Sequence, residues 1–481
     1  MRRTRTTALA VLALLNVLTL AAGLTVARML PPRLARLHVP VLAARPVVNA
    51  TPALTPAGAP DEQAAALPTA RGLAAMLGRE LPSAVTGAGL GIEVADAATG
   101  RVLYSDNADE LATPASTTKL VTAVASLAAL GPGARFTTAV RQAGGTIVLT
   151  GGGDPTLAVN EYPSADYPRP ATLAQLAAGT ASALRAQGRR TVRLGYDIAL
   201  FSGPGLAPGW SEGDIALGDV TPIVALEADQ GRLTAGGALE DDDDPVNYRP
   251  RTYDPAGVTA AAFAKLLIRY GITVTGTPAQ SAAPASAPVL ASVSSPPLTE
   301  IVEQMLTESN NVIAETLARH VAIALGMPAT FSGAAAADMT ELRRLGITAP
   351  ASLVDGSGLS PDDKIAPETL VRVLAAAAGR PALRGAVTGL PVAGFTGTLS
   401  PGDSDFGVIG GVAGGAARGV VRAKTGNLST VATLAGLVDD KAGALLLFAI
   451  MAPRVPSAYQ LPQAAAAIDA AAAGLAGCGC R

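Results

Sequence analysis

Ser116 stands three residues before Lys119 in the segment PASTTKL, near the start of a predicted helix. Side chains three residues apart lie on one face of a helix, so the hydroxyl and the amine can meet. A serine hydroxyl becomes a good nucleophile only when a base removes its proton. A lysine amine can be that base when burial or a neighbouring cation lowers its pKa. The pair alone is common, and it also fits an ordinary helix start with a surface lysine.

Two further polar motifs follow later in the chain. Ser309 and Asn311, with another asparagine between them, separate two stretches that have the apolar period of helices. Consecutive asparagines favour an exposed loop that can present side chains to a cleft. Lys424, Thr425 and Gly426 lie in a predicted strand. There Lys424 and Gly426 share a face, and the glycine permits close approach of a substrate backbone. Each motif alone is weak.

Together, Ser-x-x-Lys, Ser-x-Asn and Lys-Thr-Gly form a specific pattern, because each lies in this order on the element that the chemistry needs. The chain resembles the penicillin-recognising acyl-serine enzymes. Among them it resembles the class C low-molecular-mass penicillin-binding proteins, which are D-alanyl-D-alanine carboxypeptidases and endopeptidases. Further matches are GGGDPTL at 151–157, APGWSEGD at 207–214 and DGSGLS at 355–360. About 190 residues separate the first two motifs, and members of that group carry extra domains there.

The resemblance implies roles for the first two motifs. Ser116 would attack the carbonyl between the two terminal D-alanines of a peptidoglycan stem peptide, with Lys119 as its base. Water or the amine of another stem peptide would then resolve the acyl-enzyme. Ser309 would relay a proton to the leaving amine, and Asn311 would hydrogen-bond the substrate amide. Beta-lactam antibiotics would acylate the same serine.

The third motif would bind the substrate carboxylate and the oxyanion. Lys424 would assist the proton transfer and, with Thr425, face the free carboxylate. The backbone N–H groups of Ser116 and Asn427 would hold the oxyanion. Asn427 stands where relatives usually have threonine or serine. The backbone N–H can still hold the oxyanion, but asparagine has no hydroxyl that could contact the substrate carboxylate.

Other residues bear on substrate binding. Pro361 follows DGSGLS where the family commonly has an arginine thought to bind the diamino acid of the stem peptide, so the third-residue specificity stays open. Trp210, the only tryptophan, and Asp214 lie in a segment that resembles a loop reaching the active site from the inserted domain. A solvent-exposed turn with the tryptophan as its local anchor fits about as well. Asp154 in GGGDP is expected to be a turn-forming carboxylate.

Two other functions compete with this interpretation. A beta-lactamase or esterase of the same superfamily would share the motifs. The long insertion argues against it, and no equivalent of the deacylating glutamate of class A lactamases is evident. A non-catalytic or weakly active envelope protein that binds wall peptides is the second alternative, and the intact motifs argue against it. Covalent labelling by a fluorescent penicillin separates a binding module from an acyl-serine enzyme.

The expected fold is α+β: a transpeptidase- or beta-lactamase-like domain with helices on both faces of an antiparallel sheet. Residues 67–135 and 295–476 are expected to form it, and a beta-rich insertion of one or two small domains is expected at 136–294. Periodicity and turn residues predict the elements. They are a hairpin within 91–104, a helix capped by Thr113 and ended by Gly131, helices near 298–306, 312–325 and 367–378, strands after 418, and a last helix at 462–475.

The N-terminus has the features of an export signal or membrane anchor. Within residues 1–28, three arginines precede an apolar run from Ala8 to Ala27. No clear cleavage site follows the run, which favours an uncleaved anchor over a removed signal peptide. The protein is expected outside the plasma membrane, in the cell envelope. Residues 29–66 are typical of a Pro/Ala-rich linker.

Charge and composition exclude other functions. The net charge is −2 with mixed signs, which gives no field for nucleic acid. Two histidines and two cysteines cannot build a Cys/His metal cage, and neither metal nor cofactor is expected. Cys478 and Cys480 are expected to lie in a frayed tail. The acidic run at 240–244 is expected to be a solvated loop.

Overall fold

The computed structural model describes residues 66–160, 167–233, 249–401 and 415–480, and they belong to one compact unit. The predicted export segment, almost all of the predicted linker and the acidic run at 240–244 lie outside these residues. Within the described ranges, no helix combines the length and apolar character needed to cross a membrane.

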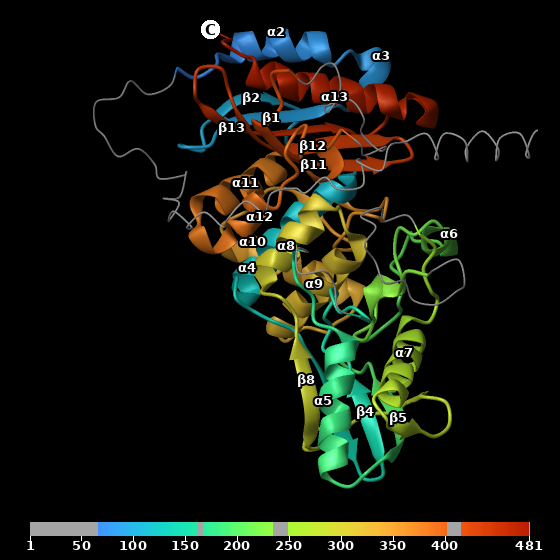
Figure 1. Ribbon diagram of the computed structural model, residues 1–481. Helices are drawn as coiled ribbons and strands as arrows, with labels where there is room; N and C mark the ends of the chain where they lie inside the picture. The colour runs from blue at the N-terminus through green and yellow to red at the C-terminus, as the bar shows by residue number, and fades with distance from the viewer. Residues whose placement is uncertain (1–65, 161–166, 234–248, 402–414, 481) are drawn as a thin grey trace, which may run out of the picture. The chain divides into compact units, whose positions relative to one another are not determined.

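A five-stranded antiparallel sheet organises the part of the fold that carries the three motifs, with the strand order β11-β12-β13-β1-β2 (Figure 1). The pairing confirms the predicted hairpin and the strands predicted after residue 418. The strands are β1 (Gly91–Asp96), β2 (Val102–Asp106), β11 (Val421–Leu428), β12 (Val431–Asp439) and β13 (Leu445–Ala452).

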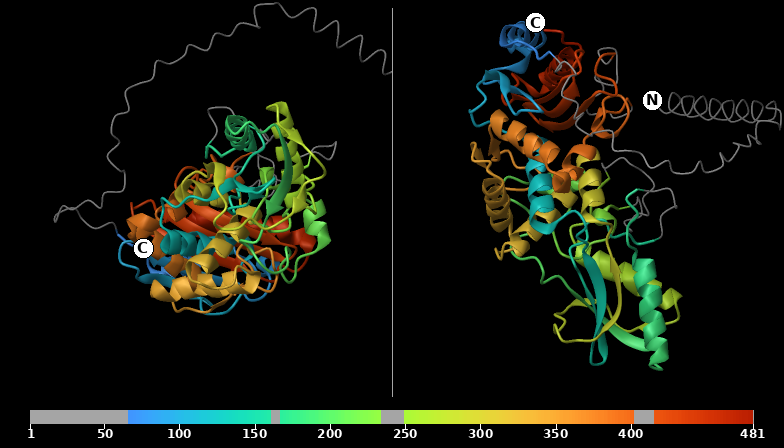
Figure 2. Two further views of the ribbon diagram at one scale, coloured as in Figure 1. Left: turned by 90° about the horizontal axis from the view of Figure 1, so that it is seen from below. Right: turned by 90° about the vertical axis from the view of Figure 1, so that its left-hand side faces the viewer.

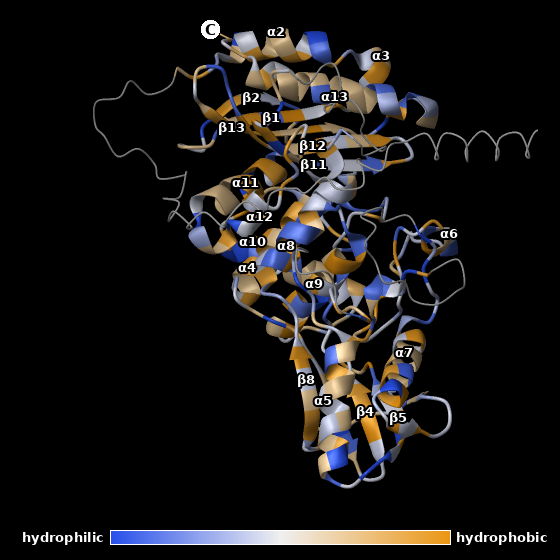
Figure 3. Cartoon of the chain, viewed as in Figure 1, coloured by the Kyte–Doolittle hydropathy of each residue, from blue (hydrophilic) through white to orange (hydrophobic). Residues whose placement is uncertain are grey.

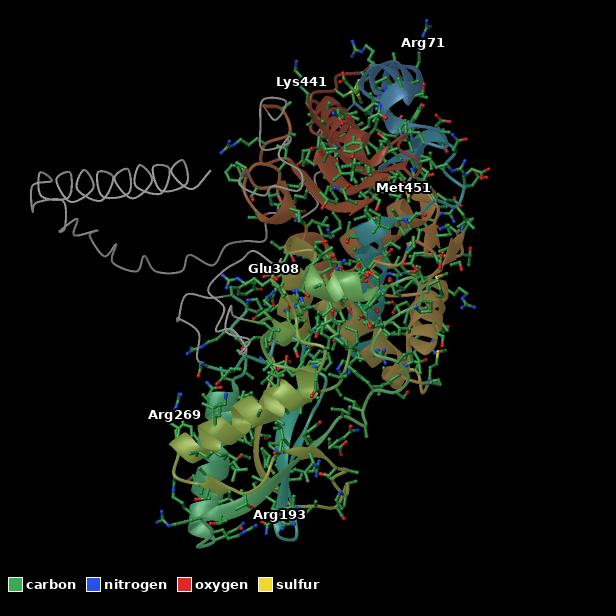
Figure 4. The ribbon with its side chains drawn as sticks, turned by 90° about the vertical axis from the view of Figure 1, so that its right-hand side faces the viewer. Arg71, Arg193, Arg269, Glu308, Lys441 and Met451 are labelled. Carbon is green, nitrogen blue, oxygen red and sulfur yellow. A yellow bond between two sulfur atoms is a disulfide. The ribbon has the colours of Figure 1, made fainter. Side chains whose placement is uncertain are left out.

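Strand β13 shows why helices must cover both faces of this sheet. Its side chains alternate between two hydrophobic cores: Phe448 and Ile450 belong to one, and Ala449 and Met451 to the other. Successive side chains of a strand point to opposite faces, so a strand that is apolar throughout must be buried on both. Figure 3 shows these apolar strands between two layers of helices, and Figure 4 labels Met451 in the sheet.

Six longer helices form these layers. Helices α2 and α13 close one core, and α4, α8, α9 and α11 close the other. The periodic segments of α8, α9, α11 and α13 confirm the prediction, whereas α2 and the neighbouring α10 were not predicted. The bounds are α2 (Ala70–Glu80), α4 (Lys119–Leu130), α8 (Leu298–Thr307), α9 (Asn311–Ala324), α10 (Phe331–Arg344), α11 (Pro367–Gly379) and α13 (Leu461–Ala476).

The helix that follows the serine motif starts differently from the prediction. A 3-10 turn, η2 (Ala115–Thr118), precedes α4, which ends at Gly131 as predicted. The predicted cap at Thr113 is wrong. Its hydroxyl donates to the Pro361 carbonyl at 3.3 Å and accepts from Lys364 Nζ at 3.0 Å. Thr113 therefore ties the chain before η2 to the segment that follows DGSGLS.

Residues 137–294 contain a second sheet of six strands, with the order β6-β5-β4-β3-β8 and with β7 beside β5. Helices α5 (Leu173–Ala186) and α7 (Pro255–Arg269) contact each other and share a separate core with it (Figure 2). Strand β5 is parallel to β4 and β6, and parallel neighbours need crossover connections, which these helices supply. The insertion is therefore more helical than predicted. Its strands are β3 (Thr137–Ala143), β4 (Thr146–Thr150), β5 (Thr191–Asp197), β6 (Thr273–Val274), β7 (Ala279–Gln280) and β8 (Val289–Ser294).

Shorter elements complete the described chain. They are α3 (Ser83–Thr86), α6 (Glu212–Ala216), α12 (Gly385–Thr388), β9 (Ala351–Ser352), β10 (Lys364–Ile365) and the 3-10 turns η3 (Asp229–Gly231), η4 (Pro381–Leu383), η5 (Gly397–Leu399) and η7 (Ala458–Gln460).

Candidate active site

Lys119 lies at the centre of a cluster of polar groups at the start of α4. Its Nζ donates to Ser116 Oγ at 2.9 Å, to Asn311 Oδ1 at 2.6 Å and to the Ser357 carbonyl at 2.8 Å. The structure thus brings together three segments that are distant in sequence. A lysine amine within hydrogen-bond distance of a serine hydroxyl has the geometry that a general base needs.

The environment of Lys119 favours the neutral amine. Burial lowers the pKa of Lys119 from 10.5 to about 7. The carboxyl groups of Asp355, Glu315, Asp363 and Asp219 oppose this shift, because negative charges favour the ammonium form. Near neutral pH, a large share of the molecules therefore carries an amine that can accept a proton.

The edge strand β11 passes very close to the serine. A Cβ atom at Gly426 would lie 3.0 Å from the Ser116 backbone nitrogen and 2.8 Å from the Pro114 carbonyl oxygen. Thr433 on β12 donates its hydroxyl proton to the same carbonyl at 2.8 Å, which joins η2 to the sheet. Glycine at 426 therefore permits the close approach of η2 to the strand.

The other residues of the Lys-Thr-Gly motif are buried on β11. Lys424 is 0% and Thr425 2% exposed. Lys424 Nζ donates to the Thr425 carbonyl at 2.8 Å, and the Thr425 hydroxyl lies 2.8 Å from that of Thr398 in η5. Asn427 follows, half-buried, and its Oδ1 has no hydrogen-bond partner among the described residues. Thr398 was not singled out from the sequence.

Ser309 occupies a tight turn between α8 and α9, two residues before Asn311. Its φ of 59° lies in the left-handed region, which non-glycine residues rarely adopt. Asn310 is 0% exposed; its side chain caps α9 and donates to Gln230 Oε1 at 2.7 Å. The prediction of an exposed loop is wrong, because Asn310 is buried between α8 and α9, where its side chain caps α9.

The inserted segment reaches the cluster through Trp210. The indole Nε1 donates to Asp355 Oδ2 at 2.8 Å, and the ring packs edge-on against Phe331 at 5.3 Å. Asp214 has a local role: it closes the capping box at the start of α6 and accepts from the backbone N–H of Ser211 at 2.6 Å. Among the described residues, the Trp210 side chain therefore hydrogen-bonds to Asp355 in the wall behind Lys119, whereas the Asp214 carboxylate hydrogen-bonds to Ser211.

Two carboxyl groups in this wall were missed by sequence reasoning. Glu315 accepts from the Ser357 backbone N–H at 2.7 Å, and Asp355 accepts from that of Gly358 at 2.7 Å. Asp355 is the first residue of the DGSGLS segment, whose sequence alone indicates the family but no contact with Lys119. The available signal was the spacing of Asn311 and Glu315, since residues four apart share one face of a helix.

Two remaining predicted residues lie outside this cluster of hydrogen bonds. Asp154 accepts from the Thr156 backbone N–H at 2.9 Å and from its hydroxyl at 2.7 Å, which confirms the turn. Pro361 offers its carbonyl to Lys364 Nζ at 2.7 Å. Neither contact involves the groups around Lys119.

The C-terminal cysteines differ from the prediction. Cys478 and Cys480 form a disulfide, and Cys478 is buried. The Cys480 carbonyl accepts from the Thr69 backbone N–H at 2.8 Å, just before α2. The predicted frayed tail is wrong, because the tail packs against the start of that helix.

Comparisons with known proteins decide the family. A model of the D-Ala-D-Ala carboxypeptidase 3 (S13) family matches residues 73–236 and 226–475. The chain belongs to this family. It is therefore a serine peptidase of the D-Ala-D-Ala carboxypeptidase class, which confirms the resemblance found in the sequence.

Relatives of this S13 peptidase support the assignment. Carboxypeptidase DacB of Mycolicibacterium smegmatis is 39% identical over 450 residues, which cover 91% of each chain. The D-alanyl-D-alanine carboxypeptidase of Actinomadura sp. is 31% identical over 438 residues, which cover 75% of this chain and 77% of that one. A crystal structure of penicillin binding protein 4 from Haemophilus influenzae has a TM-score of 0.65 at 23% identity. That alignment covers 82% of this chain and 98% of that one, and it shows the fold.

Proposed function

We propose that this protein removes the terminal D-alanine from peptidoglycan stem peptides through an acyl-enzyme on Ser116. The observation that carries the proposal is the 2.9 Å contact between Ser116 Oγ and Lys119 Nζ. Burial lowers the pKa of this lysine to about 7, so the amine can take the serine proton near neutral pH.

In the acylation step, Ser116 Oγ bonds to the carbonyl carbon of the penultimate D-alanine while Lys119 takes the hydroxyl proton. The bond from that carbon to the nitrogen of the terminal D-alanine then breaks. The leaving nitrogen takes the proton that Lys119 removed from Ser116, relayed through Ser309 with Lys424 beside it, so that Lys119 is neutral again. Water then attacks the ester, which releases the shortened peptide and returns a proton to Ser116. Backbone N–H groups of Ser116 and Asn427 hold the oxyanion, which contributes about 3 kcal/mol.

The remaining residues of the site bind the substrate in this proposal. The Lys424 ammonium and the Thr425 hydroxyl face the free carboxylate of the terminal D-alanine, beside the Gly426 backbone. Asn311 hydrogen-bonds the substrate amide, and Trp210 borders the site from the insertion. The burial of Lys424 and Thr425, the contacts between β11 and η2 and the hydrogen bond between Asn311 and Lys119 support these roles.

The proposal also covers inhibitors and location. A beta-lactam carbonyl takes the place of the scissile amide and acylates Ser116. A structure of the Haemophilus influenzae protein, 22% identical with a TM-score of 0.58, is complexed with a novel beta-lactam. The substrate is cell-wall peptide, so the enzyme acts in the cell envelope. The apolar run at 8–27 exports it and holds it at the membrane.

Intact-mass spectrometry after penicillin treatment tests the nucleophile. We expect one adduct on the wild type, none on Ser116→Ala, and one on Ser126→Ala, which changes a buried serine of α4, the helix that follows η2. Release of D-alanine from a D-Ala-D-Ala peptide should follow the same order. A folded wild type without an adduct would contradict the acyl-serine mechanism.

A further inference from the structure

The carbonyl that accepts from Lys119 is oriented from its opposite side. The peptide group that joins Ser357 and Gly358 is planar, so its C=O and N–H point in opposite directions. The C=O accepts from Lys119 Nζ at 2.8 Å, while the N–H donates to Asp355 Oδ1 at 2.7 Å. One carboxylate therefore sets the direction from which this carbonyl meets the amine.

The preceding peptide group is held in the same way. The Ser357 N–H donates to Glu315 Oε1 at 2.7 Å and to Asp355 Oδ1 at 3.1 Å. At its other edge, the Gly356 carbonyl accepts from Thr122 Oγ1 at 2.6 Å. Two successive peptide groups thus have hydrogen bonds at both edges. Burial strengthens these bonds, because the surroundings have a low dielectric constant.

Close packing also fixes this loop. A Cβ atom at Gly358, whose φ is +79°, would lie 1.9 Å from the Ala115 carbonyl oxygen. A Cβ atom at Gly356 would lie 2.7 Å from the Ala318 Cβ. The loop therefore lies between η2, which carries Ser116, and α9, with too little space for a larger residue at either glycine.

The second oxygen of Asp355 joins the insertion to the same loop. Oδ2 accepts from the Trp210 indole at 2.8 Å and from the Ser360 N–H at 2.7 Å. Asp355 is 1% exposed, so both of its oxygens are occupied inside the protein. A single carboxylate thus contacts the insertion, the loop and the peptide group that binds Lys119.

We propose that Asp355 is a positioning residue for acylation: through the Ser357–Gly358 peptide it holds the carbonyl that aims the Lys119 amine at Ser116. The inference rests on the proposed function, because it takes Lys119 as the base. The same carbonyl stabilises the ammonium that forms when Lys119 has taken the serine proton. A dipole fixed before the reaction needs no reorganisation at that moment.

Other carboxyl groups besides Asp355 lie near Lys119. Glu315 on α9, Asp363 before β10 and Asp219 from the insertion all act on Lys119. Burial and the neighbouring Asp355 raise the pKa values of Asp363 and Glu315 above their ordinary range. Among these groups, Asp355 opposes the lowering of the Lys119 pKa most strongly. Loss of its charge should therefore lower the pKa of Lys119 further.

The test compares Asp355→Asn with Asp440→Asn in the full-length protein. Asp440 is a matched control: it is buried, and its Oδ1 accepts from two backbone N–H groups at 2.8 Å in the turn between β12 and β13. The readout is the rate of acylation by a fluorescent penicillin from pH 5 to 9. For Asp355→Asn we expect a loss of about 100-fold at pH 7, the scale of a misplaced catalytic group. We also expect the acidic limb to move to lower pH. Asp440→Asn should keep the wild-type rate and limb.

The outcomes separate the two proposals. A wild-type rate and limb in folded Asp355→Asn would overturn the positioning role. Equal slowing of both variants with an unmoved acidic limb would also overturn it. If Asp355→Asn does not fold, Glu315→Gln takes its place, with an expected loss of about tenfold; a wild-type rate would then count against the inference. A wild type that penicillin does not label would refute the proposed function instead.

Discussion

The pH dependence of acylation follows from the burial of one amine. Burial lowers the pKa of Lys119 from 10.5 to about 7. At pH 7 about half of the molecules then have a neutral amine, against about one in three thousand for an ordinary lysine. At 1.36 kcal/mol per pKa unit, the site disfavours the ammonium by about 5 kcal/mol.

The direction in which the acylation rate changes with pH follows from the role of Lys119, because a base must be neutral to accept the serine proton. The acylation rate should therefore fall about tenfold per pH unit below pH 7 and level off above it. The assay is the rate constant for fluorescent penicillin labelling from pH 5 to 9, at penicillin concentrations where the rate is proportional to concentration. Lys119→Arg should be unlabelled throughout, because a guanidinium does not give up its proton in this range.

Another buried group serves as the control. Burial raises the pKa of Asp338 to about 7, so its titration could produce a limb at the same pH. The limb should persist in Asp338→Asn if Lys119 is its origin. A rate constant that is flat from pH 5 to 9, or that still rises about tenfold per pH unit between pH 8 and 9, would refute the assignment of Lys119 as the base.

Three further predictions use other parts of the fold. Gly426→Ala should slow penicillin labelling about 100-fold and lower the free energy of unfolding in urea by about 1–3 kcal/mol, because its Cβ would meet η2. Gly78→Ala, which has open space around it, should change neither the labelling rate nor the stability. Thr398→Val should raise KM for a D-Ala-D-Ala peptide about tenfold, because the variant lacks the hydroxyl beside Thr425. Thr398→Ser keeps that hydroxyl and should have the wild-type KM. A wild-type KM in Thr398→Val would show that the contact is dispensable. Burial lowers the pKa of His320 from 6.5 to about 4, so as the pH falls this histidine is protonated in the unfolded chain before it is protonated in the folded protein. The free energy of unfolding, measured by urea denaturation, should therefore fall by about 3 kcal/mol between pH 6.5 and 4. His320→Gln should lose less over this range, and an equal loss would assign the acid sensitivity to other groups.

Local geometry explains which parts of the site could be predicted from the sequence. Ser116 and Lys119 are three residues apart, so the helical repeat alone brings their side chains together. The order of the three motifs then identifies the family, which the S13 match confirms. The 3-10 turn at 115–118 could not be predicted in this way, because contacts with β11 and β12 decide how η2 lies.

Contacts between distant segments could not be predicted. The Lys119–Ser357 bond spans 238 residues, and no local pattern relates these positions. A charged residue on a helix with an apolar period is expected on its exposed face, whereas Glu315 is 1% exposed and binds backbone N–H groups. Helices α5 and α7 were missed because the many Gly and Pro turns of the insertion pointed to strands alone.

The bond between Thr69 and Cys480 makes the two ends of the described fold neighbours. The order in which the chain visits its elements is therefore open to rearrangement. A circular permutant can join residue 480 to residue 69 through a short linker and open the chain at Gly144, a turn with free space around it between β3 and β4. In such a protein the Lys-Thr-Gly strand would be synthesised before Ser116. Such a permutant would show whether the active site forms in the same way when its motifs are synthesised in another order.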